Sequence, residues 1–265
     1  MKKLLLAMAA VAMLFVGCKK DKDNTTDNLA EKIIGKWMIA ERNGEPTPTN
    51  MKRVFTFISP TEVYVSASRS EASPNDTIWF DRIKADVAIS GNKVSLINHP
   101  NEHKTSIHEF YITAIDATGF SANEKVTVTV DGEVELSQET AVRFTRVTAD
   151  YKQAILGKWE GHVTSEQGSE FDDGEDHQWE YLSDGTFRYY LRDADSNWVT
   201  NPHQTLSEYF VDGTLLCTRW IIDGTVNREW WEIASISNGV MNWTALRQDE
   251  NGQRYTATFS MTKVN

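Results

Sequence analysis

The chain has 265 residues, a formal net charge of -11 and two cysteines. Residues 151–265 hold 9 Lys plus Arg against 18 Asp plus Glu, which is 9 minus 18 or -9, whereas residues 1–150 hold 18 against 20. This acidity argues against nucleic acid or anionic lipid as a partner of the second half.

The chain begins with the pattern of an export signal. Lys2 and Lys3 supply positive charge, and the 13 residues of 4–16 form an uncharged apolar run. Such a run is too short to span a bilayer and has the proportions of a signal peptide, which we assign to residues 1–17. Residues 19–28 contain no apolar side chain and predict a flexible tether.

The end of the apolar run resembles the lipobox of bacterial lipoproteins, because the small residue Gly17 directly precedes Cys18. Phe15 departs from the Leu that is usual there. The resemblance implies a diacylglycerol thioether on Cys18, cleavage before it, and acylation of the new amino terminus. Two or three acyl chains, at about 0.8 kcal/mol per buried methylene, make such an anchor effectively permanent. A secreted protein with a chance cysteine at the cleavage site is the alternative.

This resemblance implies an outer membrane lipoprotein of a Gram-negative bacterium, with residues 18–28 as its lipidated start and tether. The mixed Lys and Asp after Cys18 also resemble the surface-export signal of some anaerobic Gram-negative bacteria. We therefore favour the cell surface over the periplasmic face of the membrane.

The two halves of the chain carry the same short motif. Residues 33–37 read Ile-Ile-Gly-Lys-Trp and residues 155–159 read Ile-Leu-Gly-Lys-Trp, while Phe-Thr-Arg-Val at 144–147 matches Met-Thr-Lys-Val at 261–264. The final Val follows the Gly by 112 positions in the first copy and by 107 positions in the second. Equal length and matching ends predict a duplicated domain. The two copies are expected at residues 29–148 and 151–265.

Each copy reads as a series of strands separated by turn residues such as Asp-Gly and Asn-Gly, which are strong hairpin signals. In the first copy, strands are predicted around Trp37 and at 54–58, 61–66, 77–89, 93–98, 106–115, 119–130 and 141–148. In the second copy, they are predicted at 159–165, 178–182, 186–192, 205–211, 214–222, 225–235, 240–248 and 253–264. No helix longer than a turn or two is predicted.

Alternation along the last strand predicts a sheet with one buried face, since Tyr255, Ala257 and Phe259 point away from the threonines between them. A meander of eight such strands closes into an up-and-down barrel, because closure removes both exposed edges. The fold class expected is therefore all-β, with two tandem eight-stranded antiparallel barrels. Cys217 is expected as a small buried residue in a strand.

A Gly-x-Trp on the first strand, an eight-strand meander and a basic residue near the end of the last strand together resemble a lipocalin-like, or calycin-type, domain. In that family the Trp closes one end of the barrel and the basic side chain packs across it. The resemblance implies the pairs Trp37 with Arg146 and Trp159 with Lys263, where Lys263 departs from the usual Arg. Tandem open sandwiches with similar strand order are the competing architecture.

Seven of the nine tryptophans follow residue 150. Strand parity predicts that several aromatic side chains of the second copy face the barrel interior. These are Trp179, Tyr181, Phe187, Tyr189, Trp231, Trp243 and Tyr255. An eight-stranded barrel either fills with such side chains or keeps a pocket for one small ligand, and parity does not decide between these outcomes. Trp230 lies on the opposite parity and is expected at a domain contact.

No metal site or catalytic motif is predicted. His99-Pro100-Asn101-Glu102-His103 fits the H-x-x-E-H string of one zinc peptidase group, but Pro100 and the flanking strand patterns make it a loop rather than the required helix. Acidic residues crowd the loop 166–176, which we interpret as solvated, with a calcium site as the alternative.

We therefore expect a non-catalytic, membrane-anchored protein that needs no cofactor and binds a small apolar or sugar-like ligand in its second barrel. The alternative is a structural or protein-interaction module of a cell-surface assembly whose barrels are plugged. The identity of any protein partner is left open by the sequence.

Overall fold

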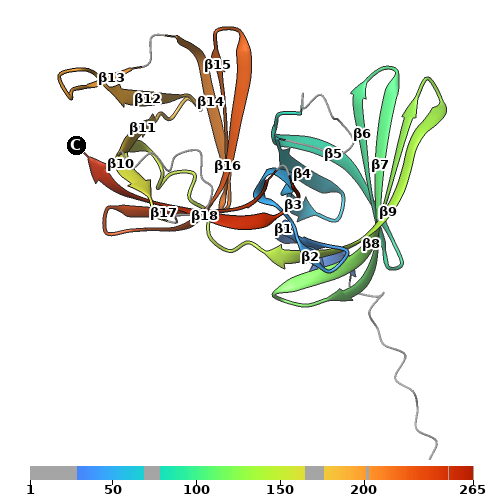
Figure 1. The fold of residues 1–265 in the computed structure, drawn as a ribbon. Helices are drawn as coiled ribbons and strands as arrows, with labels where there is room; N and C mark the ends of the chain where they lie inside the picture. The colour runs from blue at the N-terminus through green and yellow to red at the C-terminus, as the bar shows by residue number, and fades with distance from the viewer. Residues whose placement is uncertain (1–28, 69–77, 165–175, 201–202, 250, 265) are drawn as a thin grey trace, which may run out of the picture.

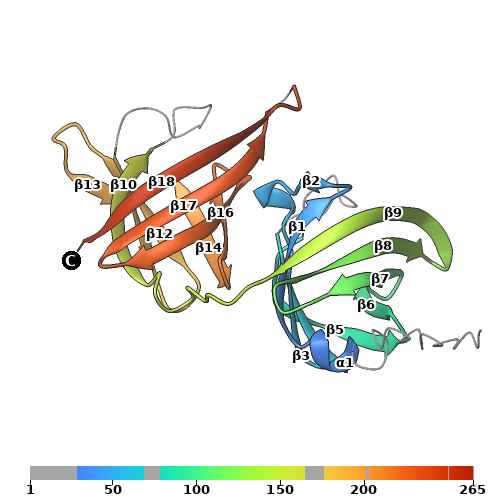
Figure 2. The same ribbon diagram turned by 90° about the horizontal axis from the view of Figure 1, so that it is seen from below.

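The computed structural model describes residues 29–68, 78–164, 176–200, 203–249 and 251–264, and it is built almost entirely of antiparallel strands. Two sheets lie side by side as separate lobes, linked by the segment between β9 and β10 (Figures 1 and 2). The predicted all-β class is confirmed, and so is the arrangement of two successive curled sheets. None of the described residues forms a helix long and apolar enough to cross a bilayer.

The first lobe is a closed barrel of eight strands. After the single-turn helix α1 (Leu29–Lys32), its elements are β1 (Gly35–Arg42), β2 (Glu45–Pro46), the 3-10 turn η1 (Thr49–Met51), β3 (Val54–Ser59), β4 (Glu62–Ala67), β5 (Phe80–Ser90), β6 (Lys93–Asn101), β7 (Lys104–Ile115), β8 (Gly119–Val130) and β9 (Glu133–Arg146). Neighbours in sequence pair along the sheet, β9 pairs back onto β1, and the short β2 pairs only with β1.

The second lobe is a curled nine-stranded sheet that does not fully close. Its strands are β10 (Gly157–Val163), β11 (His177–Tyr181), β12 (Phe187–Arg192), β13 (Trp198–Thr200), β14 (Gln204–Asp212), β15 (Leu215–Ile222), β16 (Thr225–Ser237), β17 (Val240–Gln248) and β18 (Arg254–Val264). The strand order runs from β13 through β10 and β18 to β14, so β13 and β14 are its two edges.

The second lobe differs from the closed eight-stranded barrel predicted for it, because its sheet stays open between the edge strands β13 and β14. In the described part of the chain, the two sides meet near one end, where Thr186 bridges Glu208 and the Tyr209 amide donates to the Gly185 carbonyl at 2.8 Å. Beyond that point β12 continues into a hairpin with the unpredicted three-residue strand β13 instead of pairing with β14. Large side chains stand between the diverging strands, and they line the cavity described below.

The repeated motif builds the same structure at one end of each lobe. Trp37 donates its indole N–H to the Ile33 carbonyl at 2.6 Å, and Trp159 donates to Ile155 at the same distance. Both indoles are almost completely buried. A single turn of chain thus folds under each Trp and seals that end of the sheet.

The glycine of each motif makes room for the cation above the indole. Gly35 and Gly157 have φ of +132° and +110°, which side chains rarely adopt. A Cβ on Gly35 would also lie 2.5 Å from a guanidinium nitrogen of Arg146, and one on Gly157 would lie 3.0 Å from the Lys263 side chain. The Gly-x-Trp spacing is therefore a steric requirement of the cation-capped end.

The two lobes share an apolar contact ringed by polar bonds. Met38 and Val54 of the first lobe pack with Phe210, Leu215 and Cys217 of the second. Cys217 is fully buried, as predicted, and burial raises the pKa of its thiol. Trp230 lies at the same contact, as its strand parity predicts. Its indole N–H donates to the Ser68 hydroxyl of the first lobe.

A buried carboxylate fixes the edge of this contact. Asp212, at the end of β14, is 1% exposed and lies 2.6 Å from the ammonium group of Lys36. The Ser66 hydroxyl donates to the same carboxylate at 2.6 Å. Residues far apart in sequence thus pair across the lobes, which stabilises one relative placement.

Candidate ligand-binding site

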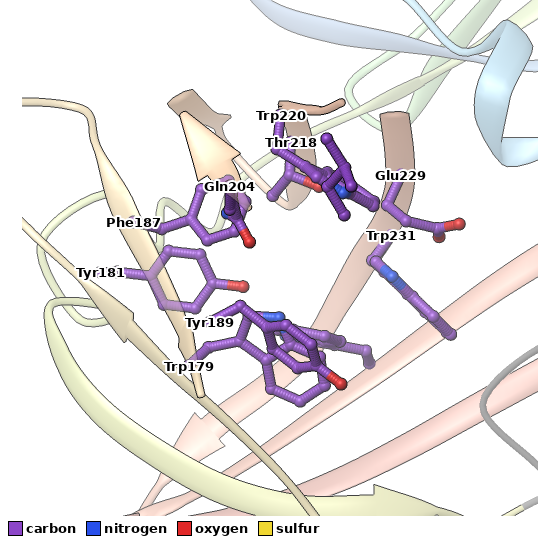
Figure 3. A pocket seen from close by; sticks show the side chains of 11 residues that line it. Trp179, Tyr181, Phe187, Tyr189, Gln204, Thr218, Trp220, Glu229 and Trp231 are labelled. Carbon is purple, nitrogen blue, oxygen red and sulfur yellow. The ribbon is translucent and has the colours of Figure 1, made fainter. Parts of the chain in front are cut away.

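A cavity of about 160 Å³ opens inside the second lobe, between its diverging strands. Figure 3 shows side chains from several strands surrounding a common space, with Tyr181 and Phe187 on one side and Trp231 and Glu229 on the other. The lining is largely aromatic and comprises Trp179, Tyr181, Phe187, Tyr189, Gln204, Thr218, Trp220, Ile222, Glu229, Trp231 and Trp243.

Four aromatic rings form a continuous wall of the cavity. The ring centroid of Trp179 lies 5.3 Å from that of Tyr189 and 5.5 Å from that of Trp243, and Trp243 lies 5.4 Å from Trp231. Rings at these separations hold one another in place through tilted contacts. The wall therefore offers a fixed apolar surface against which a flat or ring-shaped ligand can stack.

Three polar atoms of the cavity lining have no hydrogen-bond partner among the described residues. They are the Tyr181 hydroxyl, the Trp243 indole nitrogen and the Gln204 amide oxygen, whereas the amide nitrogen of Gln204 donates to Ser207. Tyr181 and Trp243 are only 1% and 3% exposed. Burial raises the pKa of Tyr181 well above its usual value, so its hydroxyl stays protonated and can donate. Buried polar groups are nearly always satisfied, so each of these atoms calls for a partner.

The only charged residue among these lining side chains is Glu229, and it is compensated. Arg247 forms a fork with its carboxylate, with nitrogen–oxygen distances of 2.5 and 3.4 Å. The same guanidinium lies 4.6 Å from the centroid of the Trp231 ring. The ion pair closes one side of the cavity and orients Trp231, and it presents the ligand with little net charge.

A histidine supports the aromatic wall from outside the cavity lining. His177 is buried, and its Nδ1 lies 2.8 Å from the Tyr189 hydroxyl. Its ring also stacks at 5.6 Å on Trp179. His177 thus fixes the orientation of two wall residues, and its contacts are those of a positioning group rather than of a proton-transfer site.

The structure brings together six of the seven residues proposed from sequence for this pocket. Tyr255 does not line the cavity and instead packs, half-buried, against the aromatic core. Tyr255 lies on the core-facing side of β18, as parity predicts. It pairs with Arg247 near the tip of the β17–β18 hairpin, beyond the cavity. Parity fixes the face of a sheet on which a side chain lies and leaves its depth along the strand open.

Sequence reasoning missed five lining residues, on β14, β15 and β16. Strand parity could have found four of them. Glu229 lies two residues from Trp231 and therefore on the same face of β16. Thr218, Trp220 and Ile222 lie on the face of β15 opposite to Cys217. Gln204 carried no such signal, because it stands at the start of its strand.

The barrel-end residues lie close together in the pairs proposed from the resemblance. The Arg146 guanidinium lies 4.2 Å from the Trp37 ring centroid, and the Lys263 ammonium lies 5.2 Å from that of Trp159. Arg146 also donates to the carbonyls of Lys32 and Ile34 at 3.4 and 3.2 Å. The geometry is that of a structural cap at each end.

Among the residues that the structure describes, the indole end of the first lobe is filled. Around the indole end, the space among Ile33, Phe55, Phe110 and Phe120 is too small to hold a water molecule. A depression of about 480 Å³ near α1 is wider, but it is an open surface groove lined by small and aliphatic residues including Ala30, Val87 and Ala88. The enclosed, aromatic character of a small-molecule site therefore belongs to the second lobe.

The opposite end of the first barrel holds a buried charge cluster. Glu124 is 1% exposed and contacts Nδ1 of His108 at 2.8 Å, with Arg42 and Arg53 at 3.5 and 3.7 Å. Burial acts to raise the pKa of Glu124, but the hydrogen bond with His108 and the two arginine charges outweigh it and lower that pKa to about 2. Burial also lowers the pKa of His108, so the ring is neutral near pH 7.

Among the described residues, no group of three or more His, Cys, Asp or Glu side chains is placed to hold a metal ion. The H-x-x-E-H string is not helical, as predicted, but it forms a hairpin rather than a loop, because His99 to Asn101 end β6 and Glu102 and His103 form the turn before β7. Most of the acidic loop 166–176, together with Cys18 and the tether, lies outside the described residues.

Comparisons with known proteins add little to this picture. No protein-family model matches the chain, and no curated protein matches it in sequence. Among solved structures, one similar chain is a double mutant of the vaccine antigen Transferrin Binding Protein B (TbpB) from Haemophilus parasuis Hp5, at 13% sequence identity and a TM-score of 0.23. The match covers 86% of this chain and 44% of that one, so the chain spans less than half the length of that protein.

Proposed function

We propose that the chain is an extracytoplasmic lipoprotein, anchored through Cys18 in the outer membrane at the cell surface, whose second lobe binds a small apolar or sugar-like ligand without chemical conversion. The observation that supports ligand binding is the aromatic cavity of 160 Å³ in the second lobe, which contrasts with the filled space at the indole end of the first lobe. Ligand sites are concave and mostly apolar, with a few placed polar groups, and the cavity fits that description.

A structural or protein-interaction module with plugged barrels is the second candidate, and the first lobe favours it. Its interior packs aromatic on aromatic, with Phe120 and Phe144 stacked at 4.5 Å and Phe55 against Phe110 at 5.7 Å. A barrel filled in this way can act on a partner only through its outside. The first lobe therefore favours the interaction module and the second lobe favours ligand binding. An experiment that shows whether the second lobe binds a ligand distinguishes the two candidates.

Fluorescence titration of the tryptophans tests the binding proposal. The soluble part of the chain is titrated with a fatty acid, a haem-like compound and a set of oligosaccharides, and saturable quenching by at least one of them is expected because four indoles line the cavity. Trp220→Ala should weaken the response, whereas Trp198→Ala, a half-buried residue outside the cavity lining, should leave the affinity unchanged. Absence of a saturable change with every probe would favour the plugged module.

The anchor has its own test. Cys18→Ala should move the protein from the membrane fraction to the soluble fraction of cells, because the residue that carries the lipid is lost. Cys217→Ala is the control and should stay with the membrane, since that thiol is buried between the lobes. Retention of the Cys18 variant in the membrane would contradict lipidation.

A further inference from the structure

The cavity of the second lobe combines an apolar wall with unsatisfied polar atoms, and this pair of properties restricts the ligand. The Tyr181 hydroxyl and the Trp243 indole N–H are donors, and the Gln204 carbonyl oxygen is an acceptor. Figure 3 shows the Tyr181 hydroxyl and the Gln204 side chain directed toward the space enclosed by the labelled residues. A ligand that satisfies all three needs both hydrogen-bond acceptors and a donor.

A purely apolar ligand does not meet this requirement. A hydrocarbon chain or an unsubstituted aromatic ring would leave each of the three buried atoms without a partner, whereas a ligand with hydroxyl groups can form hydrogen bonds with them. Sites whose polar groups are matched to ligand hydroxyls discriminate strongly against analogues that lack them. The three polar atoms therefore favour a sugar-like ligand over a purely apolar one.

The charge of the lining residues and the size of the cavity restrict the class of ligand further. Of the described lining residues only Glu229 is charged, so they offer no cation to a ligand carboxylate, and Arg247 is already engaged with Glu229. An engineered cavity of about 150 Å³ holds one benzene ring, so this cavity of 160 Å³ takes a single ring-sized group. The size therefore suits one sugar ring and not a whole porphyrin.

We propose that the ligand of this cavity is a neutral carbohydrate, bound by one ring whose C–H face stacks on the wall of Trp179, Tyr189 and Trp243. Its hydroxyls accept from Tyr181 and Trp243 and donate to Gln204. This inference rests on the proposed binding function and deepens it, because it selects between the apolar and the sugar-like classes.

Two tyrosines allow a matched test. Tyr181 and Tyr209 are both buried and lie 4.9 Å apart, but only Tyr181 lines the cavity, and only Tyr209 has its hydroxyl satisfied, by donation to the Leu182 carbonyl at 2.8 Å. Tyr181→Phe removes an orphan hydroxyl, so the free protein should melt no lower than the wild type. Tyr209→Phe removes a formed hydrogen bond, so it should melt lower.

The affinities should change in the opposite sense. Calorimetric titration with the methyl glycosides of glucose, galactose, mannose and N-acetylglucosamine, each up to 50 mM, should detect at least one that binds. Tyr181→Phe should weaken that binding roughly five- to tenfold, and Tyr209→Phe should leave it unchanged. Gln204→Met, which keeps the length of the side chain and removes its amide, should also weaken it.

Laurate and 1-anilinonaphthalene-8-sulfonate serve as apolar probes. If either binds and no glycoside does, or if glycoside binding is the same in Tyr181→Phe and wild type, the carbohydrate assignment is overturned while the binding function stands. If no glycoside and no apolar probe binds, the proposed binding function fails together with it. Glycoside binding that weakens in Tyr181→Phe and Gln204→Met but not in Tyr209→Phe supports both.

Discussion

The two lobes carry the same Gly-Lys-Trp motif at the same end of a curled sheet, yet they differ in how the rest of the sheet is used. In the first lobe, β9 pairs with β1, and phenylalanines fill the space inside. In the second, β12 turns outward into β13, and large rings line a cavity instead of packing against one another across it. The same architecture thus has a packed interior in one copy and an aromatic-lined cavity in the other.

The lysine of the motif shows how the copies have taken different roles. Lys36 lies between the carboxylates of Asp150 and Asp212 at the contact between the lobes, at 2.8 and 2.6 Å. Lys158, at the equivalent position, lies 4.3 Å from the ring centroid of Tyr190 and makes its contact within its own lobe. The shared Gly and Trp thus have the same structural role in both copies, whereas the lysine between them makes a different contact in each.

Truncation of one aromatic residue in each lobe should give the largest difference between them. Phe110→Ala empties a site where Phe55 and Phe144 pack at 5.7 and 5.6 Å, and it should cost about 3–5 kcal/mol of unfolding free energy. Tyr189→Ala enlarges a cavity that already exists, at a half-buried position, and should cost less than about 2 kcal/mol. Urea unfolding followed by circular dichroism measures both.

Hydrogen exchange locates each effect. Faster exchange should be confined to β6, β7 and β8 in the Phe110 variant, and to β11 and β12 in the Tyr189 variant. Equal costs in the two lobes would contradict the distinction between a filled and a hollow interior.

Strand parity accounts for how much of this distinction could be predicted. Alternation on β11, β12, β16 and β17 identifies six residues of the cavity lining, because one face of each strand is buried. Parity cannot show whether a sheet closes, since closure depends on where β12 turns away from β14. The contact of Ser66 with Asp212 joins residues 146 positions apart, which no local pattern reveals.

Acid should destabilise the first lobe through Glu124, whose pKa is about 2 in the folded protein against 4.5 for an exposed carboxyl. A lowered folded pKa means that the unfolded chain binds the proton more readily, so stability is complete above pH 4.5 and is lost between pH 4.5 and 2. The shift corresponds to about 3 kcal/mol. The lowered pKa of His108 acts in the same direction, beginning below pH 6.5.

Comparison of Glu124→Gln with wild type isolates this contribution. At pH 7 the variant should be less stable by about 3 kcal/mol, and the difference should shrink toward zero near pH 2 as the wild-type carboxylate is protonated. Glu109→Gln is the control, because its carboxylate pairs with Lys93 on the neighbouring strand outside the buried cluster. Thermal unfolding at a series of pH values provides the measurement, and a difference independent of pH would refute the assignment.

The two caps should differ in strength. Arg146→Ala removes a cation 4.2 Å from an indole and two hydrogen bonds to backbone carbonyls, and should cost about 2 kcal/mol. Lys263→Ala removes an ammonium at 5.2 Å and should cost about 0.5–1 kcal/mol. Chemical unfolding of the two variants compares them, and a larger loss at Lys263 would show that the caps do not work as their geometry indicates.

Lys263→Arg should make the second cap resemble the first, with the smallest effect of the series. A guanidinium at this position can lie flat on Trp159 and donate to the carbonyls of Ala154 and Leu156, which correspond to the acceptors used by Arg146. The gain should be at most about 1 kcal/mol, or a rise of roughly 2–4 °C in melting temperature. Lys158→Arg, beside Tyr190 in the same motif, should change the melting temperature less. A lower melting temperature for Lys263→Arg would mean that the space left by Gly157 fits an ammonium stem and not a guanidinium, so that the caps differ in shape as well as in charge.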